Sequence, residues 1–145
     1  MKTKKNTKGG DKEIHKVCLE GDMKRFNQLI KEKNFKVNSR GKFMFTPLMC
    51  AAHSGNLKIV NKLLKIDKVK INARSANRKT ALIVASTKGH TKIVKKLIDH
   101  GAKLHFKQFD KSTKPCKPKS ASNMSKICGH NNVGSILNKK SKKSN

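Results

Sequence analysis

Lysine and arginine side chains are the groups of this sequence that could bind a ligand in large number. The chain has 145 residues, with 36 Lys and Arg against 8 Asp and Glu, and its formal net charge is +28. A charge of this size favours association with phosphate-rich or otherwise acidic surfaces. Both ends of the chain are basic, and an excess of bases also remains in residues 11–106 between them. The sequence therefore predicts an anionic partner.

Folded RNA is the first partner class that this charge fits. Contacts to phosphates give strong attachment without sequence recognition. Because only four of the bases are Arg, bidentate base contacts in a DNA major groove are few, and shape recognition of folded RNA fits better. We therefore expect a structural or accessory component of a ribonucleoprotein particle such as a ribosome. The candidate nucleic-acid-binding residues are Lys2, Lys4, Lys5, Lys8, Arg40, Lys42, Lys68, Lys70, Arg74, Arg78, Lys79, Lys103, Lys107, Lys117, Lys119, Lys139, Lys140, Lys142 and Lys143.

Residues that could catalyse a reaction or bind a metal ion do not form a recognisable pattern. The chain has neither a Gly-x-x-x-x-Gly-Lys-Ser/Thr phosphate loop nor a Gly-x-Ser-x-Gly nucleophile turn, and its acids are scattered. Cys116, Cys128 and His130 supply three donors without a Cys-x-x-Cys pair, which is weak for zinc. Cys18 and Cys50 are expected to be packed thiols. We expect no enzyme, metal, cofactor or small-molecule substrate.

The sequence also indicates where in the cell the protein is found. No apolar run approaches the roughly 20 residues that a membrane-spanning helix needs, and the first ten residues lack the apolar segment of a secretory signal. Four cysteines at irregular spacing then suggest reduced thiols. We expect an intracellular, cytoplasmic protein without a membrane partner. The Lys-rich ends leave nuclear import as an alternative.

An internal repeat predicts the elements that position these side chains. The segment that begins at Gly21 recurs at Gly55 and at Gly89, each time after 34 residues. A second anchor, Thr46-Pro47-Leu48, returns as Thr80-Ala81-Leu82 at the same interval. In each unit the Thr is a helix N-cap, the Gly ends that helix, and an apolar stripe follows on a second helix. The period predicts stacked helix pairs.

The segment from Thr46 to Ala73 resembles the ankyrin repeat, with its Thr-Pro-Leu-x-x-Ala-Ala helix and its terminal Asn-Ala turn. The resemblance implies an all-α solenoid of stacked helix pairs, with projecting hairpin loops and a concave binding surface. The family His is replaced by Met49 and Ile83 and survives only as His15. The loop Gly before each Thr is replaced by Met44 and by Arg78. These departures put the hydrogen bonds of the loops in question, but not the stacking.

The chain divides into a basic tail at 1–10, ankyrin repeats at 11–106, a degenerate capping repeat at 107–138 and a basic tail at 139–145. The repeats span approximately 11–40, 41–74 and 75–106. The capping repeat contains a basic, Pro-containing insertion at 114–120, and its helices are expected at 121–128 and 133–137.

A protein–protein interaction adaptor is the alternative that the resemblance implies, as in the ankyrin proteins of viruses and parasites. Its partner would be an acidic protein on the concave surface, whose candidate residues are Lys16, Leu19, Glu20, Cys50, His53, Ser54 and Lys88. Phe43 and Phe45 lie beside Arg40 and Lys42 and could stack on unpaired bases. Burial preferences instead favour packing of these two rings beneath the loops.

Overall fold

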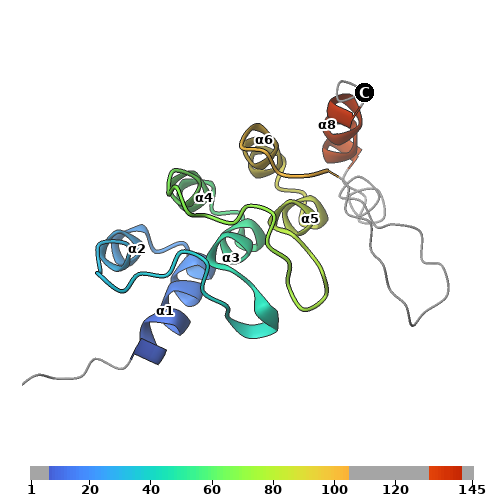
Figure 1. Ribbon diagram of the computed structural model, residues 1–145. Coiled ribbons are helices and arrows are strands. Elements are labelled where there is room, and N and C mark those ends of the chain that lie inside the picture. Colours follow the sequence, from blue (N-terminus) through green and yellow to red (C-terminus); the bar gives the residue numbers. More distant parts are fainter. Residues whose placement is uncertain (1–6, 105–130, 142–145) are drawn as a thin grey trace, which may run out of the picture.

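The computed structural model describes residues 7–104 and 131–141, and within them it contains helices but no strand (Figure 1). Three pairs of helices follow one another along the chain, and one further helix closes the described part. The helices are α1 (Thr7–Glu20), α2 (Met23–Leu29), α3 (Pro47–Ser54), α4 (Leu57–Leu64), α5 (Ala81–Thr87), α6 (Thr91–Asp99) and α8 (Asn131–Ser141), with a short 3-10 turn at Lys42–Met44. The predicted all-α solenoid of helix pairs is confirmed.

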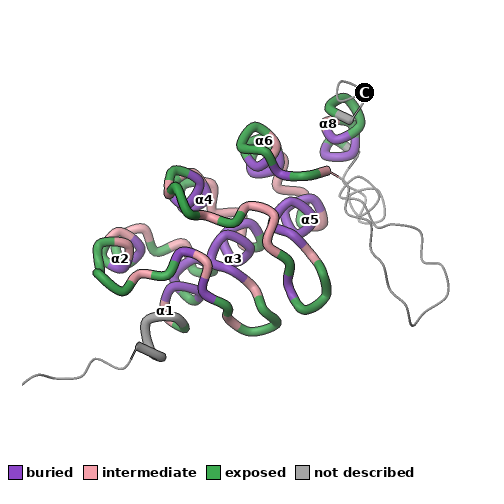
Figure 2. Tube along the Cα trace, in the orientation of Figure 1, coloured by how far each residue is buried: buried purple, intermediate pink, exposed green. Residues whose placement is uncertain are grey.

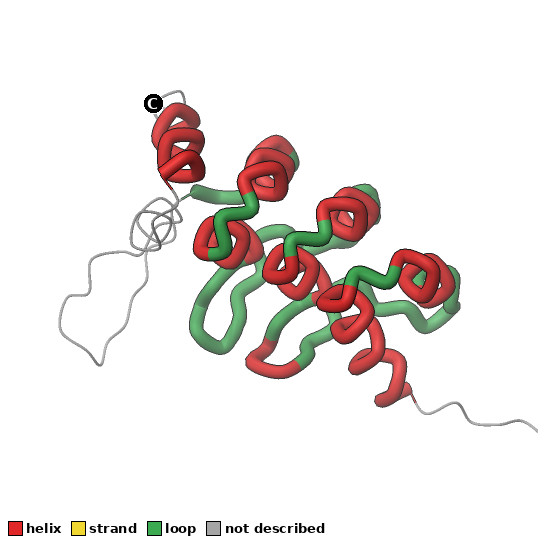
Figure 3. The backbone as a smooth tube through the Cα atoms, turned by 180° about the vertical axis from the view of Figure 1, so that it is seen from behind, coloured by secondary structure: helices red, strands yellow, loops and turns green. Residues whose placement is uncertain are grey.

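The helices form two rows. α1, α3 and α5 lie side by side in one row, and α2, α4, α6 and α8 form the other (Figure 1). The segments that join one pair to the next extend beyond the first row, on the side away from the second row (Figure 3). These segments are the projecting loops that the repeat predicts.

Local sequence explains where the helices begin and end. The Thr46 hydroxyl accepts a hydrogen bond from the Met49 amide at 3.3 Å, and Pro47 occupies the first turn of α3. The Thr80 hydroxyl accepts from the third amide of α5 in the same way, also at 3.3 Å. Gly55 ends α3 with a φ of 81°, a left-handed conformation that glycine adopts without steric cost.

The core lies between the two rows and runs the length of the stack (Figure 2). In the first row, Leu48, Ala51 and Ala52 are almost completely buried, and the two small alanines allow neighbouring helices to approach closely. In the second row, α4 buries Ile59, Val60 and Leu63, and Leu57 at its start is half-buried against the core. Burial of this continuous apolar surface is what holds neighbouring repeats together.

Both ends of the stack differ from the expected boundaries. Helix α1 begins at Thr7, inside the segment expected to be a tail at 1–10. Helix α8 continues through Ser141 and buries Val133 and Leu137 in the core, so the expected tail at 139–145 begins as helix. The predicted second helix of the capping repeat is present there, whereas its insertion and its predicted first helix lie outside the described residues.

Candidate binding surface

Two projecting loops, which we call hairpin 1 (residues 39–46) and hairpin 2 (residues 73–80), are closed by matching backbone hydrogen bonds. In hairpin 1 the Gly41 amide donates to the Phe45 carbonyl at 2.9 Å. In hairpin 2, 34 residues later, the Ser75 amide donates to the Lys79 carbonyl at 2.9 Å. The loops therefore keep their turn hydrogen bonds although the family glycine is missing from both.

The missing glycine is instead evident in the backbone conformation. Among the described residues, the non-glycine residues with positive φ are Phe43 (56°), Met44 (60°) and Arg78 (56°). Met44 and Arg78 occupy the position that the family fills with glycine. A residue with a β-carbon pays about 1–2 kcal/mol of conformational energy in the left-handed backbone conformation, so both hairpin tips are strained.

A buried histidine supports hairpin 1 from below. His15 is 7% exposed, and its Nε2 lies 3.0 Å from the Phe45 carbonyl and 3.2 Å from the Ser39 carbonyl. A β-carbon added to Gly41 would lie 2.7 Å from the imidazole ring, so the loop can pass over this ring only as glycine. In the next repeat Met49 takes the place of the histidine. There the Ser75 hydroxyl accepts a hydrogen bond from the Lys79 amide at 3.1 Å instead.

The two hairpins are bonded to each other. The Ala76 amide donates to the Phe43 carbonyl at 2.9 Å. Nη1 of Arg40 donates to the Met44 carbonyl at 2.9 Å and to the Arg74 carbonyl at 2.7 Å. Arg40 was expected to contact a nucleic acid. In the structure one end of its guanidinium joins the loops, so Arg40 is a positioning residue for the hairpins.

Exposed apolar side chains gather at the tip of hairpin 1. Phe43 is 62% exposed and Met44 is 49% exposed, and the Lys42 ammonium lies 5.2 Å from the centre of the Phe43 ring. Phe45 is half-buried against the core, as expected. The expectation that Phe43 packs beneath its loop is wrong, because the left-handed backbone at 43 and 44 turns this residue outward.

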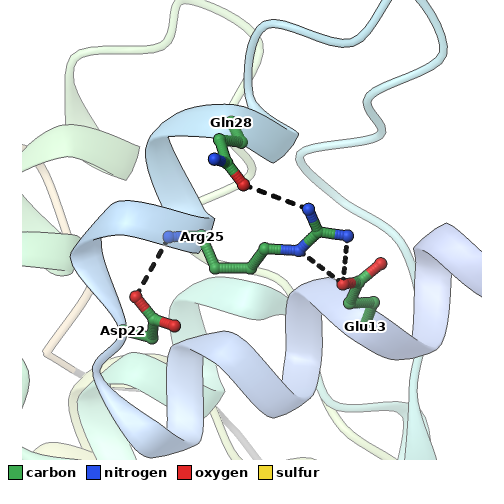
Figure 4. Close-up of polar contacts among 4 residues, drawn as sticks. All are labelled: Glu13, Asp22, Arg25 and Gln28. Atoms are coloured by element: carbon green, nitrogen blue, oxygen red, sulfur yellow. Dashed lines mark hydrogen bonds and ion pairs between the residues drawn. The ribbon is translucent and has the colours of Figure 1, made fainter.

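Carboxylates are missing from the sequence around both hairpins. No Asp or Glu occurs in residues 33–66 or in residues 68–98, which include both hairpins and helices α3 and α4. Two acids of the first repeat are bonded within that repeat: the Arg25 guanidinium donates to Glu13 at 2.6 Å, and Asp22 caps α2 (Figure 4). Near the other end, Asp99 pairs with Lys140 at 3.1 Å. The hairpins are therefore basic segments with no acid close to them in the sequence.

Within the part of the chain that the structure describes, the basic residues predicted to bind nucleic acid are spread over several elements. Lys42, Arg74 and Arg78 lie exposed on the hairpins, with Lys79 half-buried beside them. Lys68 and Lys70 lie exposed between α4 and hairpin 2, and Lys103 lies exposed after α6. Lys139 and Lys140 lie on α8 in the other row (Figure 1). Lys8 lies in the first turns of α1. Lys2, Lys4, Lys5, Lys107, Lys117, Lys119, Lys142 and Lys143 lie outside the described residues.

The residues predicted to line the concave surface lie mainly on α1 and α3. Lys16, Leu19, Glu20, His53 and Lys88 are exposed, and the Lys16 ammonium lies 3.8 Å from Glu20. Cys50 is only 4% exposed, so a partner there would meet its neighbours rather than its thiol. The Ser54 hydroxyl is also engaged, because it donates to the Cys18 carbonyl at 3.0 Å. We call the exposed members of this set, together with both hairpins, the inner face.

Positive charge also surrounds His53 on the inner face. Desolvation, followed by repulsion from Lys88, His90 and Lys79, lowers the pKa of His53 below its usual value. His90 itself is held in place, since its Nε2–H donates to the His53 carbonyl at 3.1 Å.

Asparagine side chains form contacts between repeats that the sequence did not predict. Asn38 accepts from the Lys70 amide at 2.8 Å and donates to the Lys68 carbonyl at 2.7 Å. Asn72 makes the same pair of bonds one repeat later, to Lys103 at 2.8 Å and to Gly101 at 3.3 Å. The recurrence of Asn in the repeat frame was the signal that could have revealed this role.

Two further features concern the described residues alone. No three side chains of His, Cys, Asp or Glu are grouped closely enough there to hold a metal ion. Among the helices of residues 7–104 and 131–141, none has both the length and the apolar composition that crossing a membrane requires.

Comparison with known families agrees with this geometry. A family model described as ankyrin repeats (3 copies) matches residues 14–108, which is more than half of the chain. The chain therefore belongs to the ankyrin-repeat family, whose stacked repeats form a protein-binding module and are generally non-enzymatic. No curated protein matches the chain.

Proposed function

We propose that this chain binds an acidic protein partner through its inner face. The observation that carries the proposal is the distribution of charge. Both hairpins and the exposed residues beside α3 and α5 present basic groups, and the sequence from residue 68 to residue 98 contains no carboxylate. Complementary charge accelerates encounter and selects an acidic partner over a basic one.

Exposed apolar groups on the same face favour a protein over a nucleic acid as this partner. Leu19, Phe43 and Met44 are 46%, 62% and 49% exposed. Interfaces between proteins bury such side chains at their centre and place charges around them. A phosphate backbone offers them no apolar counterpart.

Docking on folded RNA, within a ribonucleoprotein particle such as a ribosome, stays a prediction. The net charge of +28 favours it, since counterion release gives tight attachment to any polyanion. Its candidate lysines are distributed over both rows and both ends of the chain, which suits a general electrostatic contact more than one defined site.

The two partner classes are separated by charge reversal on one face. In the double variant Lys16→Glu and Lys88→Glu, two exposed bases of the inner face become acidic. The matched control is Lys92→Glu and Lys95→Glu, on the exposed side of α6, which changes the net charge by the same amount. Binding of a glutamate-rich peptide and of a folded RNA is then measured by fluorescence anisotropy at low and at physiological ionic strength.

For the acidic peptide we expect the inner-face variant to lose at least about tenfold in affinity and the control to lose much less, because close charges outweigh screened distant ones. Equal losses in the two variants, or binding of RNA alone, would overturn the proposal. In cell lysate, the same inner-face variant should lose a complex that survives nuclease treatment.

We also propose that the module is non-enzymatic and acts in the cytoplasm. The cysteines of the described residues, Cys18 and Cys50, are free thiols, which supports a reducing compartment. Localisation of the tagged chain by fluorescence microscopy tests this, and nuclear accumulation would contradict it.

A further inference from the structure

We propose that the tips of the two hairpins form an anchor site for an acidic segment that carries one bulky apolar side chain. The apolar side chain would lie against Phe43 and Met44, and the acidic residues beside it would face the bases of hairpin 2. This inference rests on the proposed function and names the chemical class of the segment that is bound.

The apolar half of the site is confined to hairpin 1. Phe43 and Met44 are adjacent, exposed and carried on a loop that projects beyond the helices (Figure 1). The residues 34 positions later, at the tip of hairpin 2, are Asn77 and Arg78, which are polar. An incoming apolar side chain is therefore recognised at one hairpin and not at the other.

The cationic half begins beside it. Lys42 lies over the Phe43 ring, and Arg74 and Arg78 are exposed on hairpin 2. The Ala76–Phe43 hydrogen bond holds the two loops next to each other, so the apolar and the basic groups belong to one continuous surface. This arrangement selects a bound segment whose apolar residue and acidic residues are close together in its sequence.

The anchor is held in position before a partner arrives. Arg40 bonds the carbonyl of Met44 and the carbonyl of Arg74, which fixes hairpin 1 against hairpin 2. The left-handed backbone at Phe43 and Met44 holds both side chains outward at a cost in strain. Strained conformations of this kind cluster at ligand-binding sites, and a rigid loop loses little entropy on binding.

The experiment uses the full chain and two synthetic peptides of equal negative charge. Each peptide is glutamate-rich; one carries a central Leu and the other a central Ser. The test variant is Phe43→Ser with Met44→Ser, and the matched control is Asn77→Ser at the equivalent tip of hairpin 2. Affinities are measured by fluorescence anisotropy, and circular dichroism verifies that each variant keeps its helices.

We expect the wild-type chain to bind the Leu peptide about tenfold more tightly than the Ser peptide, as burial of one aliphatic side chain implies. The double variant should bind both peptides equally, and Asn77→Ser should keep the preference. The preference should also persist as salt weakens both affinities. In Arg40→Lys, which retains the charge but cannot bridge both carbonyls in the same geometry, the preference should shrink severalfold.

The outcomes distinguish the two proposals. If both peptides bind the wild type equally and the inner-face charge reversal still abolishes binding, the anchor site is wrong and the proposed function stands. If neither peptide binds, the proposed function fails as well. If a single-stranded RNA binds only when Phe43 is present, and the binding of both peptides does not depend on Phe43, the tip stacks on bases. This result overturns the anchor inference.

Discussion

At the scale of single residues, Met44 and Arg78 show how this chain departs from its family. Both stand where ankyrin repeats carry glycine, and both adopt the left-handed conformation that a glycine would adopt at no cost. The hairpin geometry is therefore set by the loop as a whole, through its backbone hydrogen bonds and its contacts with the neighbouring hairpin. Met44 and Arg78 therefore adopt a strained backbone conformation that the loop imposes on them.

Met44→Gly should consequently stabilise the fold. Removal of the β-carbon relieves about 1–2 kcal/mol of strain, and the greater freedom of glycine in the unfolded chain offsets part of this, for a net gain of about 0.5–1 kcal/mol. Urea unfolding followed by circular dichroism measures the change. Ala76 in hairpin 2 does not have a positive φ, so Ala76→Gly should lower the free energy of unfolding. A loss of stability in Met44→Gly would contradict the assignment of strain to this residue.

The buried cysteines lead to a prediction about alkaline pH. Burial raises the pKa of Cys50 to about 12, and burial together with the neighbouring Cys50 raises the pKa of Cys18 still further. In the unfolded chain both thiols ionise at about pH 8.5. Because the folded state binds these protons more tightly, their contribution to stability is constant below that pH and is lost above it, by about 1.4 kcal/mol per pH unit for each thiol.

Urea unfolding between about pH 8 and pH 11 checks this slope. The control is the double variant Cys18→Ala with Cys50→Ala, in which the loss of lysine charge is unchanged and the thiols are gone. The difference between the two slopes isolates the cysteines. Identical slopes would show that neither thiol is shielded in the folded protein.

At the scale of elements, Asn38 and Asn72 bond each repeat to the next. Each side chain pairs with one amide and one carbonyl of the following segment, at the same place in successive repeats. The helices supply the apolar contact between repeats, and these asparagines fix how the extended segments lie relative to one another. They thus determine where each hairpin begins.

Asn38→Ala should lower the free energy of unfolding by about 1–2 kcal/mol, since two hydrogen bonds of about 1 kcal/mol are lost and water replaces them in part. Asn72→Ala should cost a similar or smaller amount, because one of its bonds is longer. The double variant should be additive, as the two interfaces share no residue. Asn34→Ala, at an exposed position outside these interfaces, serves as the control and should change stability by less than about 0.5 kcal/mol. If the losses do not exceed that of the control, the asparagine bonds do not stabilise the stacking of the repeats.

At the scale of the whole molecule, the charge of +28 opposes the fold that displays it. Lysines lie on the exposed sides of the second-row helices as well as on the inner face, for example Lys58, Lys92 and Lys95. The exposed ion pairs of the described residues, such as Lys16–Glu20, contribute little stability. The exposed ion pairs therefore offset little of the repulsion among the basic side chains.

Added NaCl should raise the thermal midpoint of the free chain and, over the same range, weaken its binding of an acidic peptide. The two effects have one cause, which is screening over a Debye length of about 10 Å at 0.1 M salt. The variant Lys58→Gln, Lys92→Gln and Lys95→Gln should unfold at a higher temperature than wild type in low salt and respond less to added NaCl. A midpoint that falls with salt in both proteins would show that repulsion among the lysines does not limit stability.

The fold could be predicted from residue types and spacing, because the signals for it are local and repeat in one frame. Thr46 and Thr80 cap helices through contacts three residues away, Gly55 ends a helix by its own backbone freedom, and a period of 34 residues requires similar units to stack. None of these signals depends on a distant part of the chain.

Which residues lie exposed on the proposed binding surface depends on how the repeats stack. Phe43 was expected to be buried and is exposed, and Arg40, a candidate nucleic-acid contact, joins two loops. Each of these outcomes depends on contacts between residues about one repeat apart, or on a backbone conformation imposed by a neighbouring hairpin. Such contacts form only when the repeats pack against one another, so residue type and spacing could not predict them.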